Sequence, residues 1–98
     1  MLFVMTLKWQ TGLTRDQRDG ALMRRSQWQY PQGVKLCGEY WPSSESIAVV
    51  SIFETDDHGA LMEIGFTWGD VFQIEIAPAV TAEDGLRLGP EVLARRQA

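Results

Sequence analysis

The sequence has little of what builds disulfide, metal or membrane proteins: one cysteine, one histidine and no long apolar run among its 98 residues. A lone cysteine can neither close an intramolecular disulfide nor build a cysteine-ligated zinc site, so the fold must depend on packing. No apolar run approaches the ~20 residues that cross a bilayer, and the first residues lack a basic leader with a cleavage site. We therefore expect a cytoplasmic protein without a membrane partner.

Basic side chains are absent from a long central stretch. Residues 1–35 carry six basic and two acidic side chains, whereas residues 36–86 carry ten acidic side chains and neither lysine nor arginine. The formal net charge of -4 argues against nucleic-acid binding, because phosphate neutralisation needs a basic surface. The basic first segment still leaves open an RNA or protein adaptor that would use Arg15, Arg18, Arg24 and Arg25.

Apolar periodicity and turn signals predict four strands and two helices. The strands are expected over Leu2–Trp9, Val34–Trp41, Ile47–Phe53 and Val71–Ala77, and the helices over Arg15–Trp28 and from Thr55-Asp56-Asp57 to Trp68. Thr14 and the carboxylates before the second helix are predicted N-caps, Gly69 a left-handed C-terminal residue, and Pro78 the end of the fourth strand. The first helix has a weak apolar stripe, so we expect arginine stems to cover part of the sheet.

The order of these elements is that of the ferredoxin-like βαββαβ motif, an α+β fold with a four-stranded antiparallel sheet and two helices on one face. We expect residues 1–80 to form this domain and residues 81–98 to form an appendix whose short helix starts at Pro90. The first and third strands are apolar on both faces, so a homodimer with facing sheets, a dimeric α/β barrel, is expected to cover the second face. We assign to the barrel interior Phe3, Met5, Leu7, Phe72, Ile74 and Ile76.

Four segments carry a resemblance to known proteins: residues 31–35 (PQGVK), 53–57 (FETDD), 68–72 (WGDVF) and 74–79 (IEIAPA). Together they resemble a bacterial family of small domains of unknown function with a dimeric α/β-barrel fold. The resemblance implies the fold and the homodimer but no reaction. Members often carry an Arg-Trp-His-like run where this chain has Glu39-Tyr40-Trp41, so chemistry imagined for relatives does not transfer to these positions.

Aromatic residues give the main candidate for a binding site. In the predicted topology Trp9, Tyr40, Trp41 and Trp68 gather at one rim of the sheet, with Glu39 as the nearest candidate acid or base. Aromatic core packing is one interpretation of this cluster, and a pocket for a flat apolar ligand is the other.

Metal and cofactor chemistry have little support in the sequence. His58 lies beside Glu54, Asp56 and Asp57, a set that could bind a hard cation. Helix capping explains the carboxylates without a ligand, so we predict no metal site. A glycine-rich phosphate loop and a paired-cysteine motif are both missing, and we predict no cofactor.

The sequence therefore favours a non-catalytic homodimeric scaffold or a binder of a small apolar ligand, because no convergent set of acid, base and nucleophile can be assembled from it. One alternative is a cofactor-independent enzyme of the α/β-barrel monooxygenase or isomerase type, by analogy with barrels of this shape. The other alternative is the RNA or protein adaptor described above.

Overall fold

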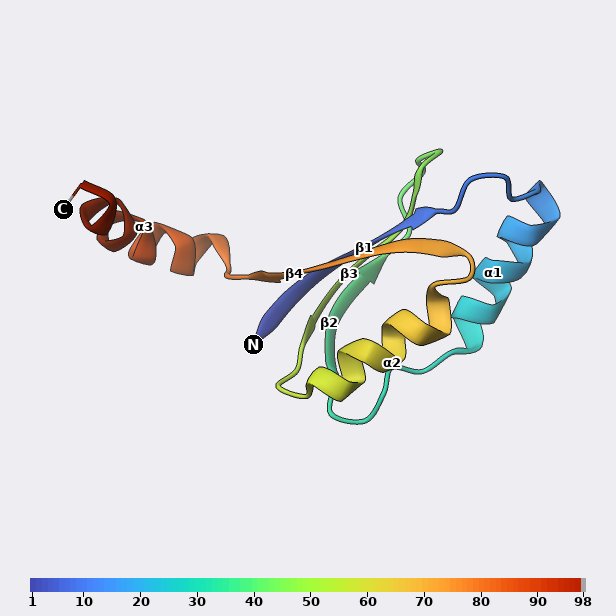
Figure 1. Cartoon of the computed structure of the whole chain (residues 1–98), viewed down its shortest axis with the longest axis horizontal. Coiled ribbons are helices and arrows are strands. Elements are labelled where there is room, and N and C mark those ends of the chain that lie inside the picture. The colour runs from blue at the N-terminus through green and yellow to red at the C-terminus, as the bar shows by residue number, and fades with distance from the viewer. Residues whose placement is uncertain (98) are drawn as a thin grey trace.

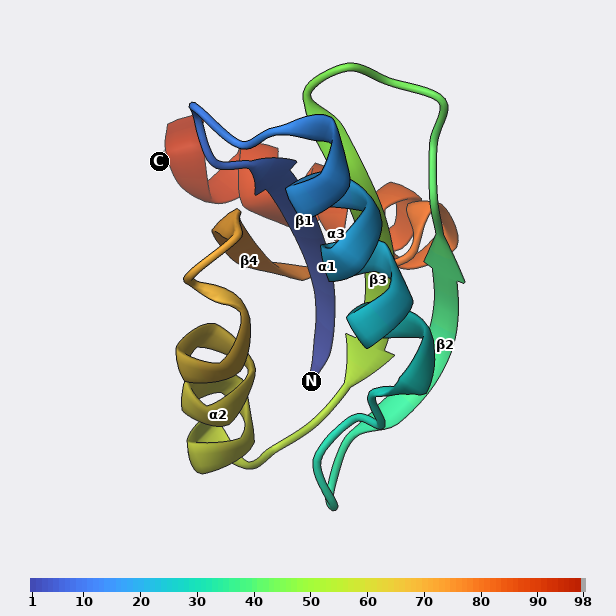
Figure 2. The same ribbon diagram turned by 90° about the vertical axis from the view of Figure 1, so that its right-hand side faces the viewer.

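The computed structural model describes residues 1–97 as seven elements in the order β-α-β-β-α-β-α (Figure 1). They are β1 (Leu2–Trp9), α1 (Arg15–Gln27), β2 (Lys35–Tyr40), β3 (Ile47–Glu54), α2 (His58–Trp68), β4 (Phe72–Ala79) and α3 (Ala82–Gln97). The strands form one antiparallel sheet in the order β2-β3-β1-β4, with α1 and α2 on the same face (Figure 2). This is the predicted ferredoxin-like α+β arrangement, extended by a third helix.

Side-chain caps set the starts of α1 and α2. Thr14 Oγ1 accepts a hydrogen bond from Gln17 N at 3.2 Å, and Gln17 Oε1 accepts from Thr14 N at 2.8 Å, which makes a capping box. Asp57 Oδ1 accepts from Gly59 N at 2.9 Å, so both predicted N-caps are confirmed. The prediction for Gly69 is wrong, because its φ is -64°. A Cβ there would lie 3.0 Å from the Gly65 carbonyl oxygen, so the glycine permits a close approach instead.

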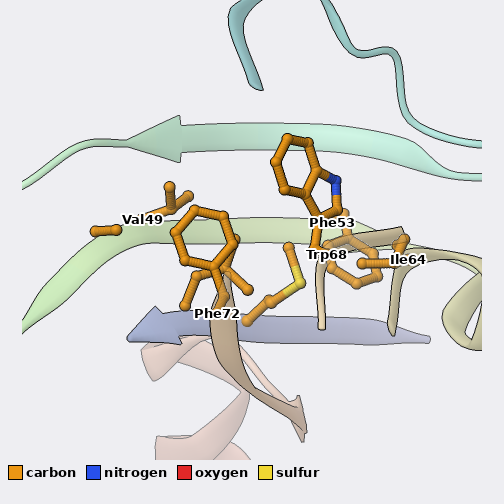
Figure 3. Packing of buried hydrophobic residues seen from close by; sticks show 8 residues of the cluster. Val49, Phe53, Ile64, Trp68 and Phe72 are labelled. Atoms are coloured by element: carbon orange, nitrogen blue, oxygen red, sulfur yellow. The ribbon is translucent and has the colours of Figure 1, made fainter. Parts of the chain in front are cut away.

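The core lies between the helices and the sheet. Ile64 and Trp68 of α2 pack against Met5 of β1, Phe53 of β3 and Phe72 of β4 (Figure 3). The predicted barrel-interior residues therefore point the wrong way, because Met5, Leu7 and Phe72 are buried under the helices and cross-strand pairing puts the rest on the same face. A shift of one residue in the alternation exchanges the two faces of a strand. The residues affected are Phe3, Met5, Leu7, Phe72, Ile74 and Ile76.

The opposite face of the sheet is apolar and lacks a cover in the described chain. We call it the open face; cross-strand register places on it Leu2, Val4, Thr6, Tyr40, Val50, Ile52 and Ala77. All of these side chains are half-buried or exposed. Neither α1 nor α2 lies on this face, and α3 projects beyond the end of the sheet (Figure 1). Lys8, Lys35, Glu54, Gln73 and Glu75 give the open face a polar rim.

Two predictions that rested on proline are wrong. β4 continues through Pro78 to Ala79, because β4 is an edge strand and an edge strand tolerates a residue without an N–H donor. α3 begins at Ala82 rather than at Pro90, since Thr81 Oγ1 already caps it by accepting from Asp84 N at 3.1 Å. Within the predicted appendix of residues 81–98, Ala98 lies outside the described residues. No helix in residues 1–97 has both the length and the apolar character needed to cross a membrane.

Candidate ligand-binding site

The site is organised by Arg25, a residue of α1 whose side chain is only 1% exposed. The buried residues of α1 are Ala21 and Arg25. The buried face of this helix therefore contains an arginine side chain, as its weak apolar periodicity predicted. The Arg25 guanidinium lies over three aromatic rings, with 4.6 Å to the centroid of Trp28, 5.0 Å to Trp68 and 5.3 Å to Tyr30. Through these cation–π contacts, Arg25 packs α1 against Trp68 of α2 and against the segment that follows α1.

Glu39 of β2 neutralises this buried cation. Arg25 Nη2 donates to Glu39 Oε1 at 2.7 Å, and Arg25 Nε donates to Glu39 Oε2 at 3.2 Å. The Tyr30 hydroxyl accepts from Arg25 Nη2 at 2.7 Å and donates to Glu39 Oε1. Ser51 Oγ, fully buried on β3, lies 2.6 Å from the same hydroxyl, and Trp41 Nε1 donates to Glu39 Oε2 at 2.9 Å. We call these five residues the Arg25 network.

The network moves the pKa values of its two titratable oxygens in opposite directions. Burial alone would raise the pKa of Glu39, but hydrogen bonds from Arg25, Tyr30 and Trp41 outweigh it and hold that pKa below its usual range. Burial, with the hydrogen bond to Glu39, raises the pKa of Tyr30 to about 12. At neutral pH the carboxylate is therefore ionised and the phenol is protonated.

The raised pKa of Tyr30 can be measured directly, because the chain has a single other tyrosine, Tyr40, which can be replaced. In a Tyr40→Phe variant only Tyr30 remains, and its phenolate absorbance is expected to rise with a midpoint near pH 12. A raised folded-state pKa stabilises the fold below the ordinary tyrosine value of about 10, and this stability is lost as pH rises through the folded value. Circular dichroism along the titration separates ionisation from unfolding. A midpoint near 10 in the folded protein would show that the phenol is not held in the network.

An open groove of about 460 Å³ lies beside the Arg25 network. Trp28, Leu36 and Trp41 supply apolar walls, and Ser26 and Gln29 add polar groups. Arg25, which also lines it, carries a buried Nη1 that has no acceptor among the described residues. We call this feature the aromatic groove; it combines apolar surface with a few convergent polar groups, which is typical of small-molecule sites.

The predicted site residues do not form one cluster. Glu39 and Trp41 lie together in the aromatic groove, whereas Tyr40 is on the open face because neighbouring strand residues point to opposite faces. Trp68 is buried in the core with Trp28 at 5.6 Å between ring centroids, and Trp9 packs on Phe72 at 5.1 Å. The structure therefore separates the side chains of Trp9, Tyr40 and Trp68 from the groove that Glu39 and Trp41 line.

Three members of the network were not predicted as site residues: Arg25, Tyr30 and Ser51. Arg25 was predicted to cover part of the sheet with its stem and to offer a possible RNA contact, but not to bind a ligand, and Tyr30 lies in the segment between α1 and β2. A usable signal was Ser51, because a hydroxyl within the apolar run Val49-Val50-Ser51-Ile52-Phe53 needs a hydrogen-bond partner once it is buried.

The other candidate clusters are occupied by structural contacts. Asp56 Oδ1 pairs with the amino group of Met1 at 2.8 Å, and Asp57 caps α2. Within residues 1–97 no group of three or more histidine, cysteine, aspartate or glutamate residues could hold a metal ion. The arginines of α1 do not form one surface either, because Arg25 is buried and Arg24 donates to both carboxylate oxygens of Asp70 at 2.9 Å.

Comparison with known proteins gives one family. The model of a family described as a domain of unknown function (DUF3303) matches residues 1–93. No curated protein gives a significant match to the chain.

Proposed function

The chain belongs to the DUF3303 family of domains of unknown function, and within that family we propose that it is a non-catalytic homodimer whose copies each bind a small, flat, mostly apolar molecule. The two sheets would face each other across a two-fold axis, as in a dimeric α/β barrel. The aromatic groove of each copy would hold the ligand. The observation that carries the binding function is the aromatic groove beside a buried, partly unsatisfied arginine.

The composition of the groove indicates the class of ligand. Trp28 and Trp41 favour a planar apolar body, because aromatic rings gain energy from stacked and edge-to-face contacts beyond the area they bury. Arg25 is already neutralised by Glu39, so an added anion would meet a carboxylate as well as a guanidinium. A ligand with neutral carbonyl or hydroxyl groups fits better, since it adds no charge beside this ion pair.

The protonation states favour binding over catalysis. A general acid or base works best with a pKa near the operating pH. The pKa of Glu39 is lowered and that of Tyr30 is raised, so both groups are moved away from neutral pH. A cofactor-independent enzyme built on this pair would need a ligand that reverses these shifts.

The homodimer is supported by the open face. Leu2, Val4, Val50 and Ile52 form a continuous apolar surface with a polar rim, and monomeric soluble proteins rarely expose a large contiguous patch of this kind. A second copy offers the same face, so a two-fold axis covers both at once.

Binding can be tested with the fluorescent dye anilinonaphthalene sulfonate and a matched pair of variants. We expect the native protein to take up the dye saturably, with quenched tryptophan emission and a raised melting temperature. Trp41→Ala is expected to weaken binding about 10-fold, because it removes one aromatic wall. Phe66→Ala, which removes an 80% exposed aromatic residue from α2, should bind like the wild type.

Two outcomes would contradict the binding function: no saturable uptake by the wild type, or equal affinity in the wild type and Trp41→Ala. Circular dichroism of each variant must match that of the wild type, because loosened states also bind such dyes.

A further inference from the structure

α3 is a helix without a surface to pack on. It spans Ala82–Gln97, and none of its residues is buried. Its interior contains Pro90 as well as Gly85 and Gly89, the two residue types with the lowest helix propensity. An isolated helix of this length is marginal even with a favourable sequence. The helix therefore needs a partner surface to be stable.

The residues of α3 divide into two faces. Ala82, Leu86, Gly89 and Leu93 follow one another at spacings of four, three and four residues, which places them on one side of a helix. Leu86 is 80% exposed and Leu93 is 54% exposed. Four charged residues lie on the other side, where Arg87 pairs with Asp84 at 3.5 Å and Arg95 with Glu91 at 4.0 Å. These four charges are paired within the helix, and the apolar face is left to make contacts.

The helix does not use the open face of its own copy. Only Val80 and Thr81 connect α3 to β4, and Thr81 fixes the start of the helix through its cap. From there α3 continues past the end of the sheet, away from α1 and α2 (Figure 1). Its apolar face and the open face are consequently two uncovered surfaces on one chain.

We propose that α3 of each copy packs its apolar face against the partner copy, beside the paired sheets, so that the dimer is closed by exchanged helices. This inference rests on the homodimer proposed above. A two-fold axis makes the exchange reciprocal, so each α3 gains a surface on its partner.

The area needed for a stable dimer supports a second copy as the occupant. A strand of eight residues is about 26 Å long and four strands are about 19 Å wide, so two facing sheets bury only about 1,000 Å² in total. Stable interfaces bury about 1,200–2,000 Å². A helix of 16 residues is about 24 Å long and 10 Å across, and two exchanged helices would bring the total to about 2,000 Å². The sheets alone fall below this range, and α3 brings the interface to standard size.

Neighbouring residues on opposite faces of α3 give a matched test in the full chain. Leu93→Glu places a carboxylate on the apolar face, and Ala94→Glu places the same group on the charged face. Sedimentation equilibrium is expected to give a dimer dissociation constant at least about 10-fold higher for Leu93→Glu than for the wild type. The reason is that each copy loses the burial of one leucine side chain. Ala94→Glu should dimerise like the wild type.

Hydrogen exchange of the α3 amides gives a second readout without a substitution. In the wild type, exchange in residues 82–97 is expected to slow as the protein concentration is raised through the dissociation constant. A dimer that keeps its affinity in Leu93→Glu, with α3 exchange independent of concentration, would overturn the helix exchange and leave the sheet dimer standing. A wild type that is monomeric at all concentrations would overturn the homodimer itself.

Discussion

Replacing Glu39 by alanine is expected to lower the free energy of unfolding by about 3 kcal/mol or more, because it leaves the Arg25 guanidinium buried without its counter-charge. The Arg25 side chain is 1% exposed and that of Glu39 is 18% exposed, so solvent does little to screen the lost interaction. Tyr30 and Trp41 also lose an acceptor. For a domain of this size, the melting temperature should fall by more than about 10 °C.

The measurement for this prediction is thermal and denaturant unfolding followed by circular dichroism. Glu63→Ala, at an exposed position of α2, serves as the control and should change stability by less than about 0.5 kcal/mol. The double variant Arg25→Met, Glu39→Met should recover much of the loss, because no uncompensated charge remains. If Glu39→Ala unfolds like the wild type, the guanidinium has access to water and the network does not hold α1.

Placing a lysine at Ile52, in the open face, is expected to weaken dimerisation by at least about 100-fold. Ile52 pairs with Val4 of β1 and Gly38 of β2, so its side chain stands among the apolar residues of that face. In the dimer the ammonium group would be buried without a partner in each copy, at a cost of a few kcal/mol. In a monomer the same side chain would extend into water, so the fold should survive.

Phe66→Lys is the matched control, since it introduces the same charge at an exposed apolar position of α2 outside the open face. It should dimerise like the wild type in sedimentation equilibrium. Equal dimerisation of Ile52→Lys and Phe66→Lys would place the interface elsewhere on the molecule.

The architecture was accessible from the sequence because local signals and periodicity agree. The alternation in β1, the capping residues Thr14 and Asp57, and the apolar run of β3 each predict the element that forms there. The facing of β1 was not accessible. Its residues are apolar on both sides, so alternation alone cannot decide which side meets the helices, and the decision comes from packing with Ile64 and Trp68.

The candidate site was accessible only in part. Glu39 and Trp41 were predicted, but the residues that give them a role come from elements far apart in the chain. The stem of Arg25 was expected to lie over the sheet, but the burial of its guanidinium was not predicted, since arginines on a polar helix are usually solvated. Its burial depends on Tyr30, Glu39 and Ser51 meeting on one side of the sheet, and no short segment contains that information.

The central claim is that two copies of this chain associate as a homodimer, and the mass of the wild-type protein in solution tests it most directly. The chain has a mass of 11.1 kDa. Sedimentation equilibrium at micromolar concentration is expected to report about twice that mass, with a concentration-dependent return to the monomer on dilution. A single species at the chain mass across the micromolar range would contradict the homodimer.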